Sequence, residues 1–333
     1  MRKLGLAVIL LLALTFILSQ FAHLEQFVSV IQRGQPLWIA LAFVVQATWL
    51  LNQTAQYRAA FRVLGIERTI RELAPLVLAS NFLNVAAPSA GVSGIAIFLD
   101  DARRRNLSSA RVTLAGVLYI LFDYIAFSAV LLLGLAVLFR RNDLTAVELI
   151  PSIILFCATI GFGSVVLLGT RSADALERLL VWMARAVNGI VRPVIRRGYL
   201  SETLAHRFAV EAAEGLRVLR QQPRGSWLFP IALSLSGKAL QIMLLFLIFL
   251  AFDQPSTIGT ITAGFSIGFL FTIVSPTPMG IGVVEGAMTL ALRTLRVPLE
   301  AAALITAVFR GYTLWLPLLY GSAALQMTGL RRN

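Results

Sequence analysis

The chain has 333 residues, of which 58% are hydrophobic and only 14% are charged, and its mean hydropathy is +0.82. This composition excludes a soluble domain with a single buried core and predicts an integral membrane protein. The net charge of +13 comes almost wholly from arginine, which we expect to hold loops on the cytoplasmic side and to attract anionic lipid head groups. A nucleic-acid partner is not expected, because no basic soluble module is evident.

Residues that commonly carry chemistry are sparse. The single cysteine, Cys157, lies in an apolar stretch, so no disulfide framework is predicted. His23 and His206 have no cysteine or acidic cluster near them in the sequence, so we predict no metal site. No Ser/His/Asp set, HExxH, CxxC or P-loop is evident, and we therefore expect neither an enzyme nor a bound cofactor.

Apolar runs of membrane-spanning length recur along the chain. The first, 4–18, follows Arg2-Lys3 and is interpreted as an uncleaved signal anchor, with a cleaved signal peptide as the alternative. Together these runs predict an all-α integral membrane protein, a polytopic helical bundle. The later spans are predicted at 36–51, 112–139, 151–168, 227–252 and 299–325.

Two further apolar stretches, 73–99 and 258–295, are interrupted in the middle. The breaks, 81–94 and 275–286, contain proline and glycine where a membrane helix would normally continue. Lipid cannot satisfy unpaired backbone N–H and C=O groups, so such breaks belong inside protein or beside a polar cavity. Paired breaks at matching places in two halves are typical of transporter binding sites.

Residues 171–224 differ in character from the rest, with ten arginines and five acids among apolar residues at helical spacing. We interpret them as basic amphipathic helices on the cytoplasmic membrane face, with a solvated linker as the alternative. The chain then divides into an N-terminal membrane half (1–170), this linker (171–224) and a C-terminal membrane half (225–333).

The distribution of arginine predicts the orientation of the spans. All arginine-rich segments become cytoplasmic only if 73–99 is a re-entrant hairpin entered from the cytoplasm and 258–295 one entered from outside. Each half then contains a span, a hairpin and a span in opposite orientations, and Pro88–Gly94 aligns with Pro276–Gly282. We therefore predict an inverted repeat, with residues 100–106 cytoplasmic and residues 286–298 external.

Four ionisable residues lie in apolar surroundings: Asp123, Lys238, Glu285 and Arg310. A charge at mid-bilayer costs about 2.5–3.5 kcal/mol on insertion scales, so these residues are expected to face the bundle interior or a cavity. In one interpretation they form structural ion pairs, Asp123 with Lys238 or Arg310, and Glu285 with Arg310.

In the other interpretation they form a substrate site. Arg310 and Lys238 would bind a phosphate head group, while Glu285 and Asp123 would tune or release it. The N-termini of half-helices after Gly94 and Gly286 would add N–H donors. Polar and glycine residues of the breaks complete this candidate set, unless they only satisfy the broken backbone: Asn84, Ser93, Thr277, Gly280 and Gly282, with Asn81, Ser89 and Ser275 as further hydrogen-bonding groups.

Several motifs carry a family resemblance over nearly the whole chain. In the second half they are Ser275–Gly286, Phe309-Arg310, Leu316-Pro317 and Gly321; in the first half they are Pro88–Gly94 and Phe122-Asp123-Tyr124. With these motifs the chain resembles the flippase-like family named after the transmembrane region of lysylphosphatidylglycerol synthases. Two positions depart from the family pattern: Ser93-Gly94-Ile95 lacks an acid often found after the first break, and Tyr119-Ile120 replaces a frequent Glu-Arg pair.

The resemblance implies translocation of a phospholipid or a lipid-linked anionic substrate between leaflets. The alternative is a non-catalytic scaffold or accessory subunit for a lipid- or envelope-modifying enzyme, and a membrane-embedded enzyme ranks last. Because the chain ends at Asn333, we expect no aminoacyl-transferase domain. We expect membrane lipids with anionic head groups as partners, leave a homo-oligomer open, and place the protein in the plasma (inner) membrane of a prokaryote with both termini cytoplasmic.

Overall fold

The computed structural model describes residues 31–86, 94–172, 174–179, 181–182, 185, 215–221, 223, 225–275 and 277–327. In these residues the secondary structure is helical throughout, without strands. Several features predicted from the sequence lie outside the described residues: the first span, Ser89, Ser93 and most of the basic linker.

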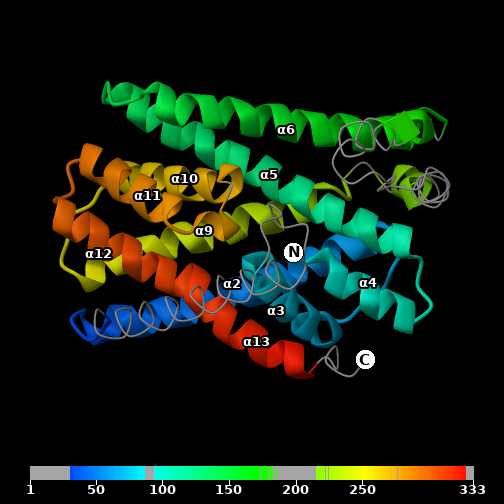
Figure 1. Cartoon of the computed structure of the whole chain (residues 1–333), viewed down its shortest axis with the longest axis horizontal. Coiled ribbons are helices and arrows are strands. Elements are labelled where there is room, and N and C mark those ends of the chain that lie inside the picture. Colours follow the sequence, from blue (N-terminus) through cyan, green and yellow to red (C-terminus); the bar gives the residue numbers. More distant parts are fainter. Residues whose placement is uncertain are drawn as a thin grey trace, which may run out of the picture.

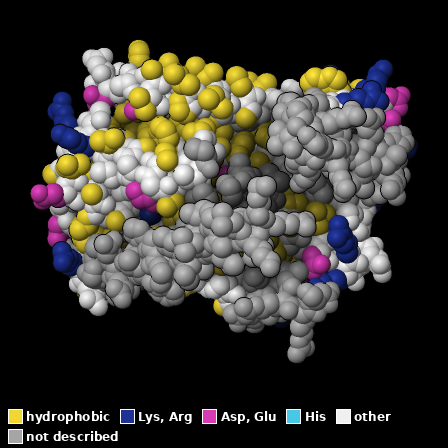
Figure 2. All heavy atoms as spheres, viewed as in Figure 1, with side chains coloured by type: hydrophobic (Ala, Val, Ile, Leu, Met, Phe, Trp, Pro, Cys, Tyr) yellow, Lys and Arg dark blue, Asp and Glu magenta, His cyan; other side chains and the backbone are white. Residues whose placement is uncertain are grey.

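Within the described part of the chain, five helical runs are long and apolar enough to cross a membrane, which confirms the predicted all-α membrane protein. The last run contains α12, a π-helical turn (η2) and most of α13. Figure 2 shows hydrophobic side chains along the upper part of the face in view, with most charged side chains toward its left and right ends. The elements of the five runs are α2 (Pro36–Val63), α5 (Ser109–Arg140), α6 (Ala146–Arg171), α9 (Leu228–Ala251), α12 (Leu299–Arg310), η2 (Gly311–Trp315) and α13 (Leu316–Met327).

Each interrupted stretch forms two short helices around a break. The first contains α3 (Ile70–Ala86) and α4 (Ile95–Arg104); the second contains α10 (Ile258–Val274), the 3₁₀ turn η1 (Pro278–Gly280) and α11 (Val283–Thr294).

Both breaks are shorter than predicted. The helix α3 continues through Ala86, because no proline occurs between Asn81 and Ala86 and the first helix-breaking residue is Pro88. The helix α11 begins at Val283, ahead of the start predicted after Gly286, which places Glu285 in its first turn.

The two arms of each hairpin meet at its base. At the first base, the Arg68 guanidinium donates to the Asp101 carboxylate at 2.7 Å and Arg105 contacts Glu72 at 3.2 Å, which joins the start of α3 to the end of α4. At the second base, Arg141 reaches residues on both arms of the α10–α11 hairpin: its Nη2 donates to the Thr257 hydroxyl and its Nη1 to the Leu295 carbonyl, at 3.3 and 3.4 Å.

The two hairpin bases lie at opposite ends of α5. This helix begins just after α4 and ends at Arg140, beside Arg141, and its 32 residues span about 48 Å. In Figure 1, α10 and α11 accordingly lie toward one end of the bundle and α3 and α4 toward the other. How the hairpins sit relative to a bilayer stays a prediction.

The first arm of each hairpin packs against a long helical run of the other half. The arm α3 packs against α13, where a Cβ on Gly321 would lie 2.7 Å from the Leu78 carbonyl oxygen. The arm α10 packs against α5, where a Cβ on Gly134 would lie 2.7 Å from Cβ of Ser266. Glycine therefore permits backbone approach at both crossings.

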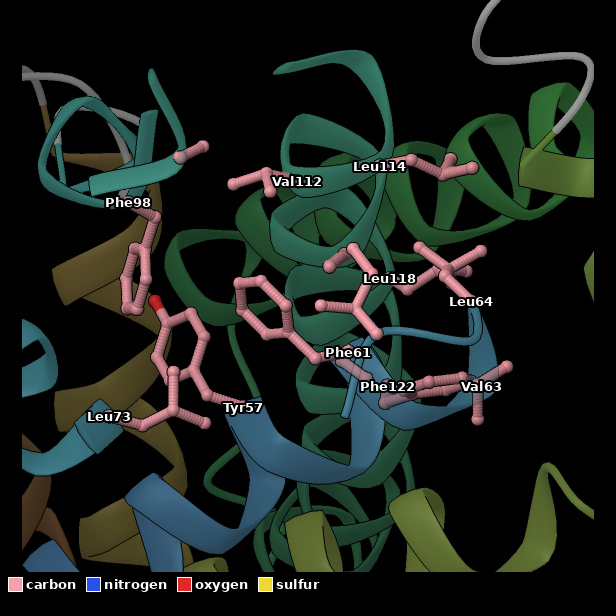
Figure 3. Close-up of a cluster of buried hydrophobic side chains, with 14 of the residues drawn as sticks. Tyr57, Phe61, Val63, Leu64, Leu73, Phe98, Val112, Leu114, Leu118 and Phe122 are labelled. Atoms are coloured by element: carbon pink, nitrogen blue, oxygen red, sulfur yellow. The ribbon is translucent and has the colours of Figure 1, made fainter. Parts of the chain in front are cut away.

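Two large apolar clusters hold the hairpins in place. In the first, Tyr57 of α2 stacks on Phe98 of α4 and on Tyr119 of α5, with ring centroids 4.6 and 3.9 Å apart. Figure 3 shows Tyr57 of this cluster beside Leu73 and Phe98. In the second, Phe127 of α5 packs against Phe269 of α10 at 4.5 Å. The helices α2 and α9 pack along each other and join the halves.

The close crossing at Gly321 predicts a large effect of one added methyl group. Gly321→Ala should destabilise the protein by about 1–3 kcal/mol, because overpacking forces α13 away from α3. Thermal unfolding in detergent measures the effect. Gly161→Ala is the matched control, since a Cβ there meets nothing within 4 Å; equal melting temperatures for the two variants would contradict the packing argument.

The hairpin bases generate a topology prediction. In a Cys157→Ser background, Asn106→Cys should be shielded from an impermeant thiol reagent in intact cells, whereas Thr294→Cys should react. The reason is that the arginine-rich first base is expected in the cytoplasm and the second outside. Labelling of Asn106→Cys from outside the cell would refute the orientation.

Candidate functional site

A cavity of about 460 Å³ lies between the two halves of the bundle. Its walls come from both hairpins and from the long helices of both halves, so neither half forms the site by itself. The described residues that line it are Trp49, Gln53, Gln56, Asn81, Asn84, Val85, Tyr119, Ile120, Asp123, Tyr124, Gly237, Lys238, Gln241, Gly268, Phe269, Thr272, Ile273, Ser275, Thr277, Met279, Val284, Phe309, Arg310, Thr313 and Pro317.

Lys238 forms the first ion pair of the cavity. Its Nζ lies 2.8 and 2.9 Å from the two carboxylate oxygens of Asp123, and the lysine is only 4% exposed. The same Nζ lies 3.7 Å from the ring centroid of Phe269, a cation–π contact. The pair therefore connects α5, α9 and α10, and thus both halves of the chain.

Arg310 forms the second ion pair and is also 4% exposed. Its Nε donates to Oε1 of Glu285 at 2.8 Å, and its Nη2 donates to the carbonyl oxygen of Met279 at 2.9 Å. The other carboxylate oxygen of Glu285 accepts from the Gly282 N–H at 2.7 Å. Arg310 of α12 thus binds both the unwound backbone and the first turn of α11.

The backbone of the second break requires left-handed conformations. Met279, Gly280 and Gly282 have φ of 49°, 72° and 83°, a region that glycine adopts without strain. The Thr277 hydroxyl donates to the Ile281 carbonyl at 3.0 Å and bonds to the Ser275 hydroxyl at 2.8 Å. These contacts support the interpretation in which the polar residues of the break satisfy its backbone.

Asn84 performs the corresponding task at the first break. Its Oδ1 accepts from the Gly94 N–H at 2.7 Å, so it joins the two sides of the break. A Cβ on Gly94 would lie 2.8 Å from the Asn84 amide group, which explains the glycine at this position. Asn81 pairs reciprocally with Gln53 of α2, at 2.9 and 3.1 Å.

Two of the predicted ion pairs are confirmed: Lys238 with Asp123 and Arg310 with Glu285. Asp123 binds Lys238 rather than Arg310. As a result each cation is already neutralised, and the charges at the cavity balance among the described residues. No group of three or more His, Cys, Asp or Glu side chains in the described ranges could hold a metal ion.

Three glutamines of the cavity were not predicted from the sequence. Gln53 and Gln56 lie on α2, and Gln241 lies one helical turn after Lys238 on α9. A signal was present, since Gln53 and Gln56 are three residues apart on α2 and Gln241 is three residues after Lys238 on α9, so each pair shares one helix face. Such side chains in a membrane helix are expected to point to the interior.

These features define a polytopic helical membrane protein with two broken hairpins around a cavity lined by both apolar and polar side chains, whose buried cations are paired with acids. The chain belongs to the family of the lysylphosphatidylglycerol synthase TM region, whose model matches residues 3–321. The resemblance predicted from the motifs is thereby confirmed, and a lipid-related role in the membrane is consistent with it.

Archaeal relatives extend the similarity over nearly the whole chain. A UPF0104 membrane protein of Methanothermobacter thermautotrophicus is 22% identical over 303 residues, which cover 90% of this chain and 88% of the relative. A UPF0104 membrane protein of Methanocaldococcus jannaschii is 22% identical over 339 residues, with 96% and 93% covered.

The burial of the Lys238–Asp123 ion pair predicts that the stability of the protein depends strongly on both partners. Lys238→Met should destabilise the protein by about 3–5 kcal/mol, because it leaves the Asp123 carboxylate without its counter-ion. The double variant Lys238→Met/Asp123→Leu should recover most of this loss, since a packed apolar pair replaces the ion pair. Thermal unfolding of both variants in detergent is the measurement; a single variant as stable as the parent would show that the pair does not stabilise the bundle.

Proposed function

We propose that this protein moves lipids between the two leaflets of the plasma membrane, with the cavity taking the polar head group. The observation that carries the proposal is a cavity of about 460 Å³ inside a bundle of membrane-spanning helices, with the buried cations Lys238 and Arg310 on its walls, each paired with an acid. Intramembrane charges are costly and typically mark substrate or ion pathways. The volume is within the range of about 300–1,000 Å³ that is common for ligand pockets.

The same proposal includes an inverted repeat with two re-entrant hairpins. The contacts that support it are paired: α3 packs on α13 as α10 packs on α5, and the hairpin bases lie at opposite ends of α5. Rocking of one repeat against the other would open the cavity to each leaflet in turn. In this arrangement both termini are cytoplasmic.

Arg310 is the proposed contact to an anionic head group. Both cavity cations are paired, so a phosphate must replace an acid before it can bind. Glu285 suits this exchange, because its side chain is 35% exposed whereas that of Arg310 is only 4% exposed. The Arg310 guanidinium would then turn from the Glu285 carboxylate to a phosphate, whose oxygens can accept from two of its N–H groups at once.

A scaffold role is the second candidate, and in it the ion pairs only stabilise the bundle. A tightly packed interior would favour that role, whereas the cavity between the halves favours transport. We propose no catalytic step for this chain.

Leaflet exchange of labelled phospholipids in reconstituted vesicles tests the function. Arg310→Ala and Glu285→Gln should abolish exchange while inserted, folded protein remains. Arg293→Ala, on the exposed surface of α11, is the control and should exchange lipids normally.

The apolar double variant Arg310→Met/Glu285→Leu separates transport from structure. If the pair only stabilises the bundle, the double variant should recover the folded protein that a single change loses, about 3–5 kcal/mol. If the pair serves the substrate, the double variant should stay inactive however stable it is. Normal exchange by a well-folded double variant would exclude a substrate role for both residues.

A further inference from the structure

Gln241 carries a buried hydrogen-bond acceptor without a partner in the wall of the cavity. It lines the cavity from α9, is only 6% exposed, and its Oε1 accepts a hydrogen bond from no described residue. A buried acceptor without a partner costs about 1–3 kcal/mol, so its retention in a cavity wall indicates a donor supplied by a ligand.

Two hydroxyl groups add acceptors to the same cavity. The hydroxyl of Thr272 on α10 donates to the Gly268 carbonyl at 3.0 Å, and that of Thr313 on η2 donates to the Phe309 carbonyl at 2.9 Å. Because each hydroxyl donates its only proton to a carbonyl, it can now act only as a hydrogen-bond acceptor toward a ligand. Phosphate oxygens cannot satisfy these groups, because an ionised phosphodiester has no hydrogen to donate.

The charge balance argues against a cationic donor. Both Asp123 oxygens contact Lys238, and the Glu285 oxygens accept from Arg310 and from the Gly282 N–H. The face of Phe269 that would attract an ammonium group already holds Lys238 at 3.7 Å. A ligand ammonium would therefore add an unpaired positive charge, which a neutral hydroxyl group would not.

We propose that the cavity binds the neutral, hydroxyl-bearing part of a lipid head group, a glycosyl or polyol group. This inference rests on the proposed lipid transport and names the chemistry of its substrate. Hydroxyl donors meet Gln241, Thr272 and Thr313, while Trp49 and Tyr119 supply aromatic surface for the apolar faces of the group. If the same lipid also carries a phosphate, that phosphate can still replace the Glu285 carboxylate at Arg310.

Binding to the full chain in phosphatidylcholine nanodiscs tests the inference. The probes are monoglucosyl diacylglycerol, phosphatidic acid with the same acyl chains, and free glucose, with the bound probe measured by native mass spectrometry. Phosphatidylcholine itself has no donor in its head group. The glucosyl lipid should bind at least tenfold more tightly than phosphatidic acid, because it offers several neutral hydroxyl donors, whereas a phosphate monoester has at most one O–H and adds unbalanced negative charge.

Substitutions test whether the preference for the glucosyl lipid depends on the acceptor groups of the cavity wall. Gln241→Leu should weaken binding of the glucosyl lipid about fivefold to tenfold, the value of one neutral hydrogen bond. Thr313→Val provides a second, independent test and should weaken it in the same direction. Gln46→Leu is the matched control: Gln46 is a buried glutamine of α2, 3% exposed, that does not line the cavity, and binding should be unchanged.

Each contrary result has a defined meaning. Tighter binding of phosphatidic acid, or unchanged binding of the glucosyl lipid by both folded variants, would overturn the inference. If free glucose bound as tightly as the glucosyl lipid, the claim that the hydroxyl-bearing group belongs to a lipid would be wrong. In vesicles, exchange of phosphatidic acid but not of the glucosyl lipid would refute this inference alone, whereas the absence of any lipid exchange would refute the proposed function as well.

Discussion

The guanidinium of Arg310 must be neutralised where it is buried, and much of the C-terminal half follows from this requirement. A cation that is 4% exposed among apolar helices needs both a counter-charge and hydrogen-bond acceptors. Glu285 supplies the charge, and the Met279 carbonyl supplies a further acceptor. For these groups to meet Arg310, the chain between α10 and α11 must unwind and turn back, which explains its left-handed residues.

The same contacts solve the problem of broken backbone in a membrane. Unwound N–H and C=O groups cannot be left to lipid, so side chains must bind them. Glu285 accepts from the Gly282 N–H, Thr277 donates to the Ile281 carbonyl, and Asn84 accepts from the Gly94 N–H across the other break. Polar residues of the breaks are therefore structural first, and any contact with a substrate is added to that role.

The cavity combines charge balance with unsatisfied acceptors. Its two cations are bound to two carboxylates, so the electrostatic attraction for a free ion is weak, while Gln241 keeps an acceptor without a partner. In the proposed transport, a charge-balanced site of this kind would release a head group more readily than a net positive one. A transporter needs such release, because a substrate bound too tightly cannot leave on the other side.

Local chemistry alone determined much of this protein. Hydropathy over some twenty residues identifies the spans, and proline and glycine locate the breaks, because both effects act within a short segment. The sequence also required that the interior charges find partners. Only the tertiary structure decided that Asp123 binds Lys238 rather than Arg310, since that choice depends on how α5, α9 and α12 pack. The same holds for Gln241, because whether a glutamine in a span finds a partner or faces a cavity depends on neighbours far away in the sequence.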